Sequence, residues 1–194
     1  MTTPARLSYR AQAVRAALAV GVLAHAATPA PAADNWRIDP ARTHIAFAID
    51  AVGYPRTHGE FRQFAGRISV DFQHPEMSKV SFHVQSQSVD VGSTSFDDYL
   101  RSPAFLNSAR FPSIDFTSGS ITKIDDHTVR VAGDLTLLGV TRPLSVQVAV
   151  QREDGRLAFL AKTTIDRLEF GMNSGFPLVS RDVELVISSA AVQL

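Results

Sequence analysis

The stretch Thr43-His44-Ile45-Ala46-Phe47-Ala48-Ile49-Asp50 alternates between two kinds of side chain along its length. Ile45, Phe47 and Ile49 fall on one face, and small or polar residues fall on the other. A period of two residues is typical of a β-strand that buries one face. This stretch therefore predicts a strand whose large apolar side chains belong to the interior of a sheet structure.

The same alternation recurs throughout the chain from Trp36 onward. Its apolar positions are Phe64, Gly66, Ile68, Val70 and Phe72; Val80, Phe82 and Val84; Val129, Val131, Gly133, Leu135 and Leu137; Leu144, Val146, Val148 and Val150; Leu157, Phe159 and Ile165; and Val183, Leu185 and Ile187. Turn signals such as Asp125-Asp126 and Glu153-Asp154-Gly155 separate the runs. Roughly eight strands with one apolar face each predict an all-β, antiparallel fold, either a closed barrel or a sandwich.

One segment departs from the alternation. Residues Ser95–Arg101 predict a short helix between strands, with Ser93 or Thr94 as its N-cap and acidic residues in its first turn. Pro103 ends that helix. The apolar connection Phe105–Pro112 follows, and we expect it to cap one end of a barrel.

The N-terminus has the features of a secretory signal. An apolar stretch at 16–24 is preceded by three arginines and followed by Ala30-Pro31-Ala32, which fits the A-x-A cleavage pattern. That stretch is too short to span a bilayer, which needs roughly 20 residues. We expect residues 1–32 to be removed near Ala32 or Ala33, which leaves one domain over 33–194 in the periplasm.

Composition narrows the function classes. The formal net charge is zero, so the sequence shows no basic footprint for nucleic acid. Removing residues 1–32 takes away Arg6, Arg10 and Arg15 and no acid, so the remaining chain carries about three negative charges. The absence of cysteine excludes thiol catalysis and cysteine-ligated metals. We expect no cofactor and no stable membrane insertion, since no second apolar stretch reaches spanning length.

The motifs of catalysis and metal binding are weak. Ser86, Ser88 and Asp90 are not part of a G-x-S-x-G nucleophile turn, and no histidine pair has the H-x-x-x-H spacing. His44 and His83 fall on polar strand faces, where we expect them to be solvated. The sequence therefore predicts neither an enzyme nor a metal site.

A barrel of about eight strands either fills itself with side chains or encloses one slim ligand. Its predicted interior mixes bulky with small residues, namely Phe47, Phe82 and Phe159 with Ala51, Gly66 and Ala161. That mixture is compatible with a solid core and with a tunnel. A tunnel would bind an apolar chain by excluding water, with about 0.8 kcal/mol for each buried methylene group.

Several segments occur in a characteristic order: Trp36–Phe47, Gly59–Phe61, Phe64–Ile68, Tyr99–Leu106, Phe111–Phe116, Gly133–Pro143, Asp166–Met172 and Val179–Leu185. Together they resemble the YceI-like family of polyisoprenoid-binding periplasmic proteins. The resemblance implies a lipocalin-like antiparallel barrel that holds a long isoprenoid chain, a polyprenyl phosphate or the tail of a quinone, for carriage or storage. Asp50 and Tyr99 depart from the family pattern, since histidines often occupy these positions.

The resemblance also implies site residues. The apolar lining would comprise Phe47, Ile49, Phe82, Val84, Phe105, Phe116, Leu135, Phe159 and Phe170. Arg101, Arg142 and Arg167 are candidates for a polar head group, because guanidinium donors suit phosphates and carbonyls. For Arg167 the alternative is a structural role, with its donors bound to a carboxylate or to loop carbonyls.

Two other functions remain open at this point. One is an enzyme that acts on a small hydrophobic substrate in the same barrel, which requires an inward polar residue in mid-strand with a perturbed pKa. The other is a stress-related protein with a filled core, which binds a partner through its outer face. A homodimer through an outer sheet face is compatible with the pattern but not required by it.

Overall fold

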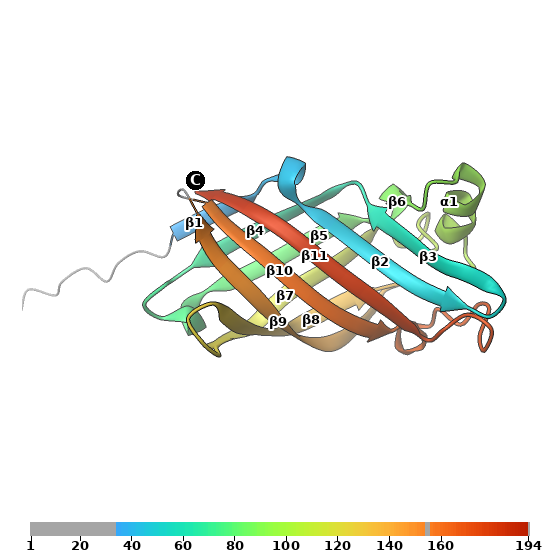
Figure 1. Ribbon diagram of the computed structural model, residues 1–194. Helices are drawn as coiled ribbons and strands as arrows, with labels where there is room; N and C mark the ends of the chain where they lie inside the picture. Colours follow the sequence, from blue (N-terminus) through green and yellow to red (C-terminus); the bar gives the residue numbers. More distant parts are fainter. Residues whose placement is uncertain (1–33, 154–155, 194) are drawn as a thin grey trace, which may run out of the picture. The chain divides into compact units, whose positions relative to one another are not determined.

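The computed structural model describes residues 34–153 and 156–193. Eight antiparallel strands form a closed barrel (Figure 1): β1 (Asp34–Ile38), β4 (Phe64–Val70), β5 (Lys79–Gln85), β7 (Ser113–Lys123), β8 (Thr128–Leu137), β9 (Val140–Glu153), β10 (Arg156–Asp166) and β11 (Asp182–Gln193). The barrel closes where β11 pairs with β1, with Ile38 opposite Ala191. The predicted all-β, lipocalin-like barrel of about eight strands is confirmed.

Three further strands lengthen one side of the wall. They are β2 (His44–Ala51), which follows β1 along β11, β3 (Tyr54–Phe61), which precedes β4, and β6 (Val89–Asp90), which follows β5. The 3-10 turn Pro40–Arg42 separates β1 from β2, which would otherwise form one long strand along β11. In this turn the Asp39 carboxylate accepts a hydrogen bond from the Ala41 amide at 3.1 Å. Proline has no amide hydrogen for the ladder, so the long strand breaks there.

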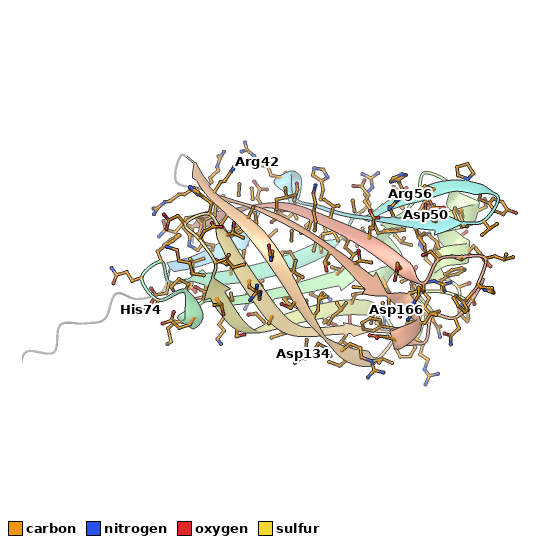
Figure 2. The ribbon with its side chains drawn as sticks, turned by 60° about the horizontal axis from the view of Figure 1, so that its bottom comes forward. Arg42, Asp50, Arg56, His74, Asp134 and Asp166 are labelled. Atoms are coloured by element: carbon orange, nitrogen blue, oxygen red, sulfur yellow. The ribbon has the colours of Figure 1, made fainter. Side chains whose placement is uncertain are left out.

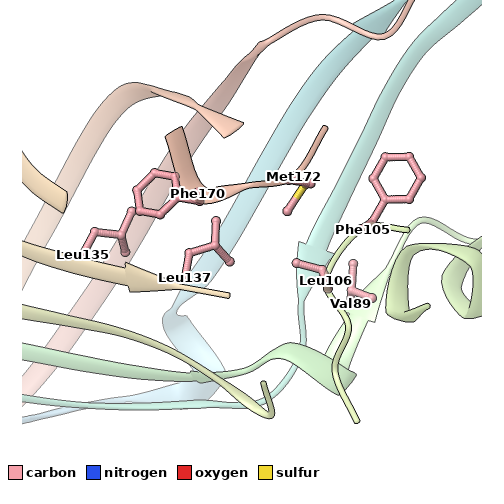
Figure 3. Packing of buried hydrophobic residues seen from close by; sticks show 7 residues of the cluster. All are labelled: Val89, Phe105, Leu106, Leu135, Leu137, Phe170 and Met172. Atoms are coloured by element: carbon pink, nitrogen blue, oxygen red, sulfur yellow. The ribbon is translucent and has the colours of Figure 1, made fainter. Parts of the chain in front are cut away.

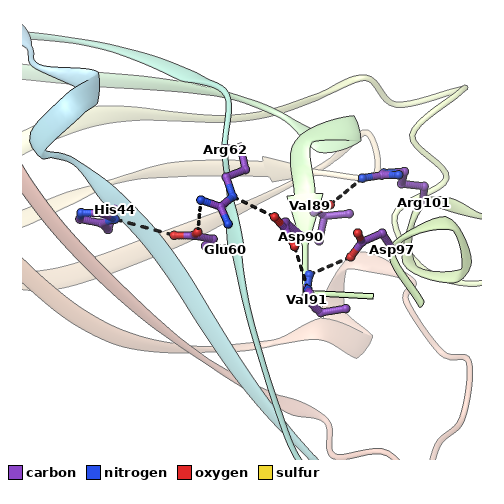
Figure 4. A network of polar contacts seen from close by, with 9 residues as sticks. His44, Glu60, Arg62, Val89, Asp90, Val91, Asp97 and Arg101 are labelled. Atoms are coloured by element: carbon purple, nitrogen blue, oxygen red, sulfur yellow. Dashed lines mark hydrogen bonds and ion pairs between the residues drawn. The ribbon is translucent and has the colours of Figure 1, made fainter. Parts of the chain in front are cut away.

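The helix α1 (Thr94–Arg101) occupies the connection between β6 and β7, one residue longer than the predicted Ser95–Arg101. Polar contacts tie it to β6 (Figure 4): the Asp97 carboxylate accepts from the Val91 amide at 2.7 Å, and Arg101 donates to the Val89 carbonyl at 2.8 Å. The connection after the helix buries Phe105 and Leu106 at the end of the barrel where α1 lies. This agrees with the expectation that Phe105–Pro112 caps one end of the barrel.

A second part of the same network lies on the outer surface and joins β2, β3 and β6 (Figure 4). Arg62 binds Glu60 at 2.7 Å and Asp90 at 2.9 Å, and His44 lies 3.7 Å from Glu60. The Gly92 amide and Arg62 together hold the pKa of Asp90 below its usual value. These contacts fasten the added strands from outside and leave their inner face apolar.

The predicted apolar faces point into the barrel, where they form two buried clusters. One lies near α1 and comprises Val89, Phe105, Leu106, Leu135, Leu137, Phe170 and Met172 (Figure 3). The other comprises Trp36, Ile38, Ile68, Leu157 and Ala191, around the strand β1.

Gly133 allows a close approach between β7 and β8. A Cβ atom at this position would lie 2.2 Å from the Thr117 carbonyl oxygen, beside the bulge between Ser118 and Ser120. We expect Gly133→Ala to destabilise the protein by about 1–3 kcal/mol, because the main chain must shift to relieve the overlap. Denaturant unfolding followed by the fluorescence of the single tryptophan, Trp36, measures the change.

The control for this prediction is Gly119→Ala in the bulge itself. The nearest atom to a Cβ at Gly119 is the Ala132 carbonyl oxygen at 3.8 Å, an ordinary contact. The control should therefore unfold close to the wild-type denaturant concentration. Equal destabilisation by both substitutions would contradict the assigned role of Gly133.

The predicted signal segment, residues 1–32, and its cleavage site lie outside the described residues. Within the described ranges, α1 and the shorter helical turns include none that is long and apolar enough to cross a membrane.

Candidate functional site: an apolar cavity inside the barrel

A cavity of about 1080 Å³ occupies the interior of the barrel. Most of its lining is aliphatic or aromatic and comes from the inward faces of the strands. Its volume lies slightly above the range of about 300–1,000 Å³ that is typical of small-molecule sites. The barrel is therefore not filled by its own side chains, which disagrees with the filled core that the partner-binding alternative assumed.

The structure places the predicted lining residues at this cavity with one exception. Phe47, Ile49, Phe82, Val84, Phe105, Phe116, Leu135 and Phe159 all line it. Phe170 does not, because it follows the end of β10 in the 3-10 turn Arg167–Phe170 and packs in the cluster with Leu135 and Leu137 (Figure 3). That the predicted lining residues contact a ligand stays a prediction.

Part of the lining was not predicted from the sequence. Phe96, Tyr99 and Leu100 of α1 face the cavity, as does Tyr54 at the start of β3. The Tyr99 ring lies edge-on to Phe105, with 5.0 Å between the ring centroids. The spacing of Phe96, Tyr99 and Leu100, at i, i+3 and i+4, is the signal that could have identified them as one apolar helix face.

Charged lining residues occur at strand ends and turns. They include Lys123 and Asp126 near the β7–β8 turn and Arg152 near the end of β9. Lys123 donates to Asp126 at 2.6 Å and lowers the pKa of that carboxyl, and the Arg152 guanidinium lies over the Phe72 ring at 5.2 Å. In mid-strand the polar lining groups are hydroxyls, namely Thr57, Thr163 and Ser189.

Arg167 is fully buried and holds the loop that precedes β11. Its Nε donates to the Ser180 carbonyl at 2.7 Å, its Nη2 to the Val179 carbonyl at 3.0 Å, and its Nη1 to the Met172 carbonyl. Burial lowers the pKa of the guanidinium, and the neighbouring Asp166 opposes that shift. The side chain borders the cavity, but these bonds match the structural alternative, in which its donors bind loop carbonyls.

Arg101 and Arg142 do not line the cavity. Arg101 donates to the Gln87 and Val89 carbonyls at 2.8 Å each, and Arg142 donates to the Glu169 carbonyl at 3.3 Å. The three predicted head-group arginines are thus bound to main-chain oxygens of three different segments. A head-group role for any of them stays a prediction.

One polar cluster on the outer face has the residue types of a catalytic triad but another geometry. His83 Nδ1 lies 2.6 Å from Asp115 Oδ1, and the Ser113 hydroxyl donates to Asp115 Oδ2 at 2.6 Å. Both groups bind the carboxylate, so no bond from Ser113 to His83 activates the hydroxyl. The side chains of His83 and His44 are exposed, as predicted for solvated histidines.

Residues 36–191 match the model of the YceI-like domain. Protein YceI of Escherichia coli is 35% identical over 169 residues, which cover 83% of this chain and 88% of that protein. Protein YceI of Salmonella arizonae is 34% identical over 174 residues, which cover 86% of this chain and 91% of that protein.

Solved structures share the fold at low sequence identity. BcnA of Burkholderia cenocepacia has a TM-score of 0.75 at 20% identity and covers 79% of this chain and 98% of its own. A polyisoprenoid binding domain of Saccharophagus degradans has a TM-score of 0.69 at 16% identity and covers 82% of this chain and 98% of its own. With a family match over most of its length and a relative at 35% identity, this chain belongs to the YceI-like family.

Proposed function

We propose that this protein is a periplasmic binding protein for a long-chain isoprenoid lipid, a polyprenyl phosphate or a quinone tail, which it carries or stores inside the barrel. The observation that carries the proposal is the cavity of about 1080 Å³ with its predominantly apolar lining. Such a lining offers an alkyl chain a surface free of water and offers a polar molecule few partners.

The energetics favour a long chain over a short one. Each buried methylene contributes about 0.8 kcal/mol. Five carbons thus supply roughly 4 kcal/mol, which only equals the lower bound of about 4–15 kcal/mol for the lost freedom of association. About twenty carbons supply roughly 16 kcal/mol before that loss, so a chain of several isoprene units is retained where a single unit is not.

Family membership and the sequence add further support. The related domain of Saccharophagus degradans is a polyisoprenoid binding domain. The signal-like features of residues 1–32 favour a periplasmic location. The placement of charged lining residues at strand ends, with hydroxyls in mid-strand, favours binding over acid–base catalysis in the middle of the barrel.

Calorimetric titration of delipidated protein with geranylgeraniol at several temperatures tests the proposal. We expect saturable one-to-one binding whose enthalpy becomes more negative as temperature rises, since burial of apolar surface gives a negative heat-capacity change. A shorter homologue, geraniol, should bind at least about a hundredfold more weakly because it buries fewer methylenes. The absence of saturable binding of either alcohol would overturn the proposal.

A further inference from the structure

The lining of the cavity includes residues at both ends of the barrel, and the two ends differ in chemistry. At the end near α1 the exposed lining side chains are Tyr54, Tyr99 and Phe96, which are 78%, 51% and 37% exposed. At the opposite end, near the β7–β8 turn, the lining combines charged residues such as Lys123 and Arg152 with the exposed ring of Phe72, over which the Arg152 guanidinium lies. An apolar chain that enters the cavity therefore meets a more uniformly apolar lining at the α1 end.

Further apolar side chains extend this end outside the cavity. Val52 in the β2–β3 turn and Phe176 and Leu178 in the loop before β11 are exposed and do not line the cavity. The Val52 amide donates to the Leu178 carbonyl at 2.8 Å, which joins the turn to the loop. We call the combined surface the apolar rim; it comprises Val52, Tyr54, Phe96, Tyr99, Phe176 and Leu178.

The composition of the rim fits a lipid surface. Tyr54 and Tyr99 are the two tyrosines of the described residues, and both lie in the rim. Tyrosine is enriched at membrane–water interfaces because its ring is apolar and its hydroxyl is hydrated. Clustered exposed apolar side chains of this kind are uncommon on monomeric proteins and mark interaction sites.

Charges near the rim are paired with one another. Arg56 lies 2.7 Å from Glu184 and 3.6 Å from Asp50. Arg181 binds Asp166, and Arg101 binds Asp98 at 3.1 Å. Figure 2 shows Asp50, Arg56 and Asp166 at this end of the barrel and His74 at the other. The rim therefore presents no field of one sign that would select a strongly charged partner, and an uncharged lipid surface matches it.

We propose that the apolar rim docks onto the surface of a lipid bilayer, so that an isoprenoid chain passes between the bilayer and the cavity without crossing bulk water. This inference rests on the proposed function, since it concerns how the same ligand enters. A long apolar chain that leaves a bilayer through water exposes every methylene, and docking removes that barrier. Rim side chains inserted at the headgroup level supply the binding energy.

The test uses delipidated protein and phosphatidylcholine vesicles that contain geranylgeraniol. The double substitution Val52→Ser/Leu178→Ser removes rim side chains that do not line the cavity. The matched control Leu160→Ser/Val186→Ser removes a leucine and a valine that are 41% and 36% exposed on β10 and β11. We expect the rim variant to bind vesicles at least about tenfold more weakly than wild type and the control, as measured by co-sedimentation. It should also extract geranylgeraniol from the vesicles at least about tenfold less well than either of them.

Two further arms separate the proposals. Geranylgeraniol dispersed from ethanol bypasses the bilayer, and the rim variant should take it up as wild type does. If wild type takes up the alcohol from neither source, the proposed function itself is refuted.

A Met77→Ser/Ile124→Ser variant changes exposed apolar residues outside the rim and should behave as wild type. Docking at the rim is overturned if wild type does not sediment with vesicles, or if the rim variant extracts from them at the wild-type rate.

Discussion

Ala161→Trp will strongly weaken isoprenoid binding while the barrel stays folded. Ala161 lies in β10 with its side chain at the cavity, directly opposite Val148 of β9. An indole at this position extends into the space that a bound chain would occupy. Because the proposed long ligand would run through the barrel, one bulky side chain would exclude all the methylenes beyond it, and we expect affinity to fall by at least about a hundredfold. Calorimetric titration with geranylgeraniol measures the loss.

The matched control for this prediction is Ala149→Trp. Ala149 pairs with Leu160 one step along the same ladder, and its side chain is exposed on the outer face. The control variant should bind geranylgeraniol as wild type does. Thermal unfolding of both variants tests that Ala161→Trp fills the cavity rather than unfolding the barrel. Unchanged binding by a folded Ala161→Trp protein would show that the ligand does not occupy the middle of the cavity.

Arg167→Met will destabilise the protein by about 3 kcal/mol or more. The substitution keeps most of the buried side-chain volume but removes the donors to the carbonyls of Ser180, Val179 and Met172. Each buried acceptor left without a donor costs roughly 1–3 kcal/mol, and the three together hold the loop before β11. Denaturant unfolding followed by Trp36 fluorescence measures the change in free energy.

Arg181→Met serves as the control for the Arg167 prediction. Arg181 is more than half exposed and binds Asp166, whose pKa it holds below the usual range. Water replaces most of that interaction when the arginine is removed, so the control should be far less destabilised. If Arg167→Met unfolds at the same denaturant concentration as Arg181→Met, the loop does not depend on the buried guanidinium.

Strand faces could be predicted from the sequence because they depend only on local alternation. Phe82 and Val84, for example, line the cavity as their spacing indicates. The interruptions of the long strands were not predicted, since each shifts the phase of the alternation: inward residues are even-numbered at Trp36 and Ile38 but odd-numbered at Ile45 and Phe47. The alternation on each side of Pro40 therefore predicts a separate strand. It does not indicate that both strands pair with β11.

The candidate site was predictable where it lies on strands and less so elsewhere. Phe170 was assigned to the lining by resemblance, yet it follows a strand end, where a period of two no longer determines direction. The volume of the cavity depends on strand tilt and stagger, which no single segment encodes. The apolar rim joins Val52 and Leu178 across a long stretch of sequence, so only the folded chain brings its parts together.

The proposed function requires an isoprenoid lipid in the barrel interior. Mass spectrometry of an organic extract from protein purified from its native cells detects such a lipid. We expect an isoprenoid in an amount stoichiometric with the protein, and its mass would identify the head group and the chain length. An extract without lipid, both from the native protein and after its incubation with isoprenoid lipids, would contradict the proposed function.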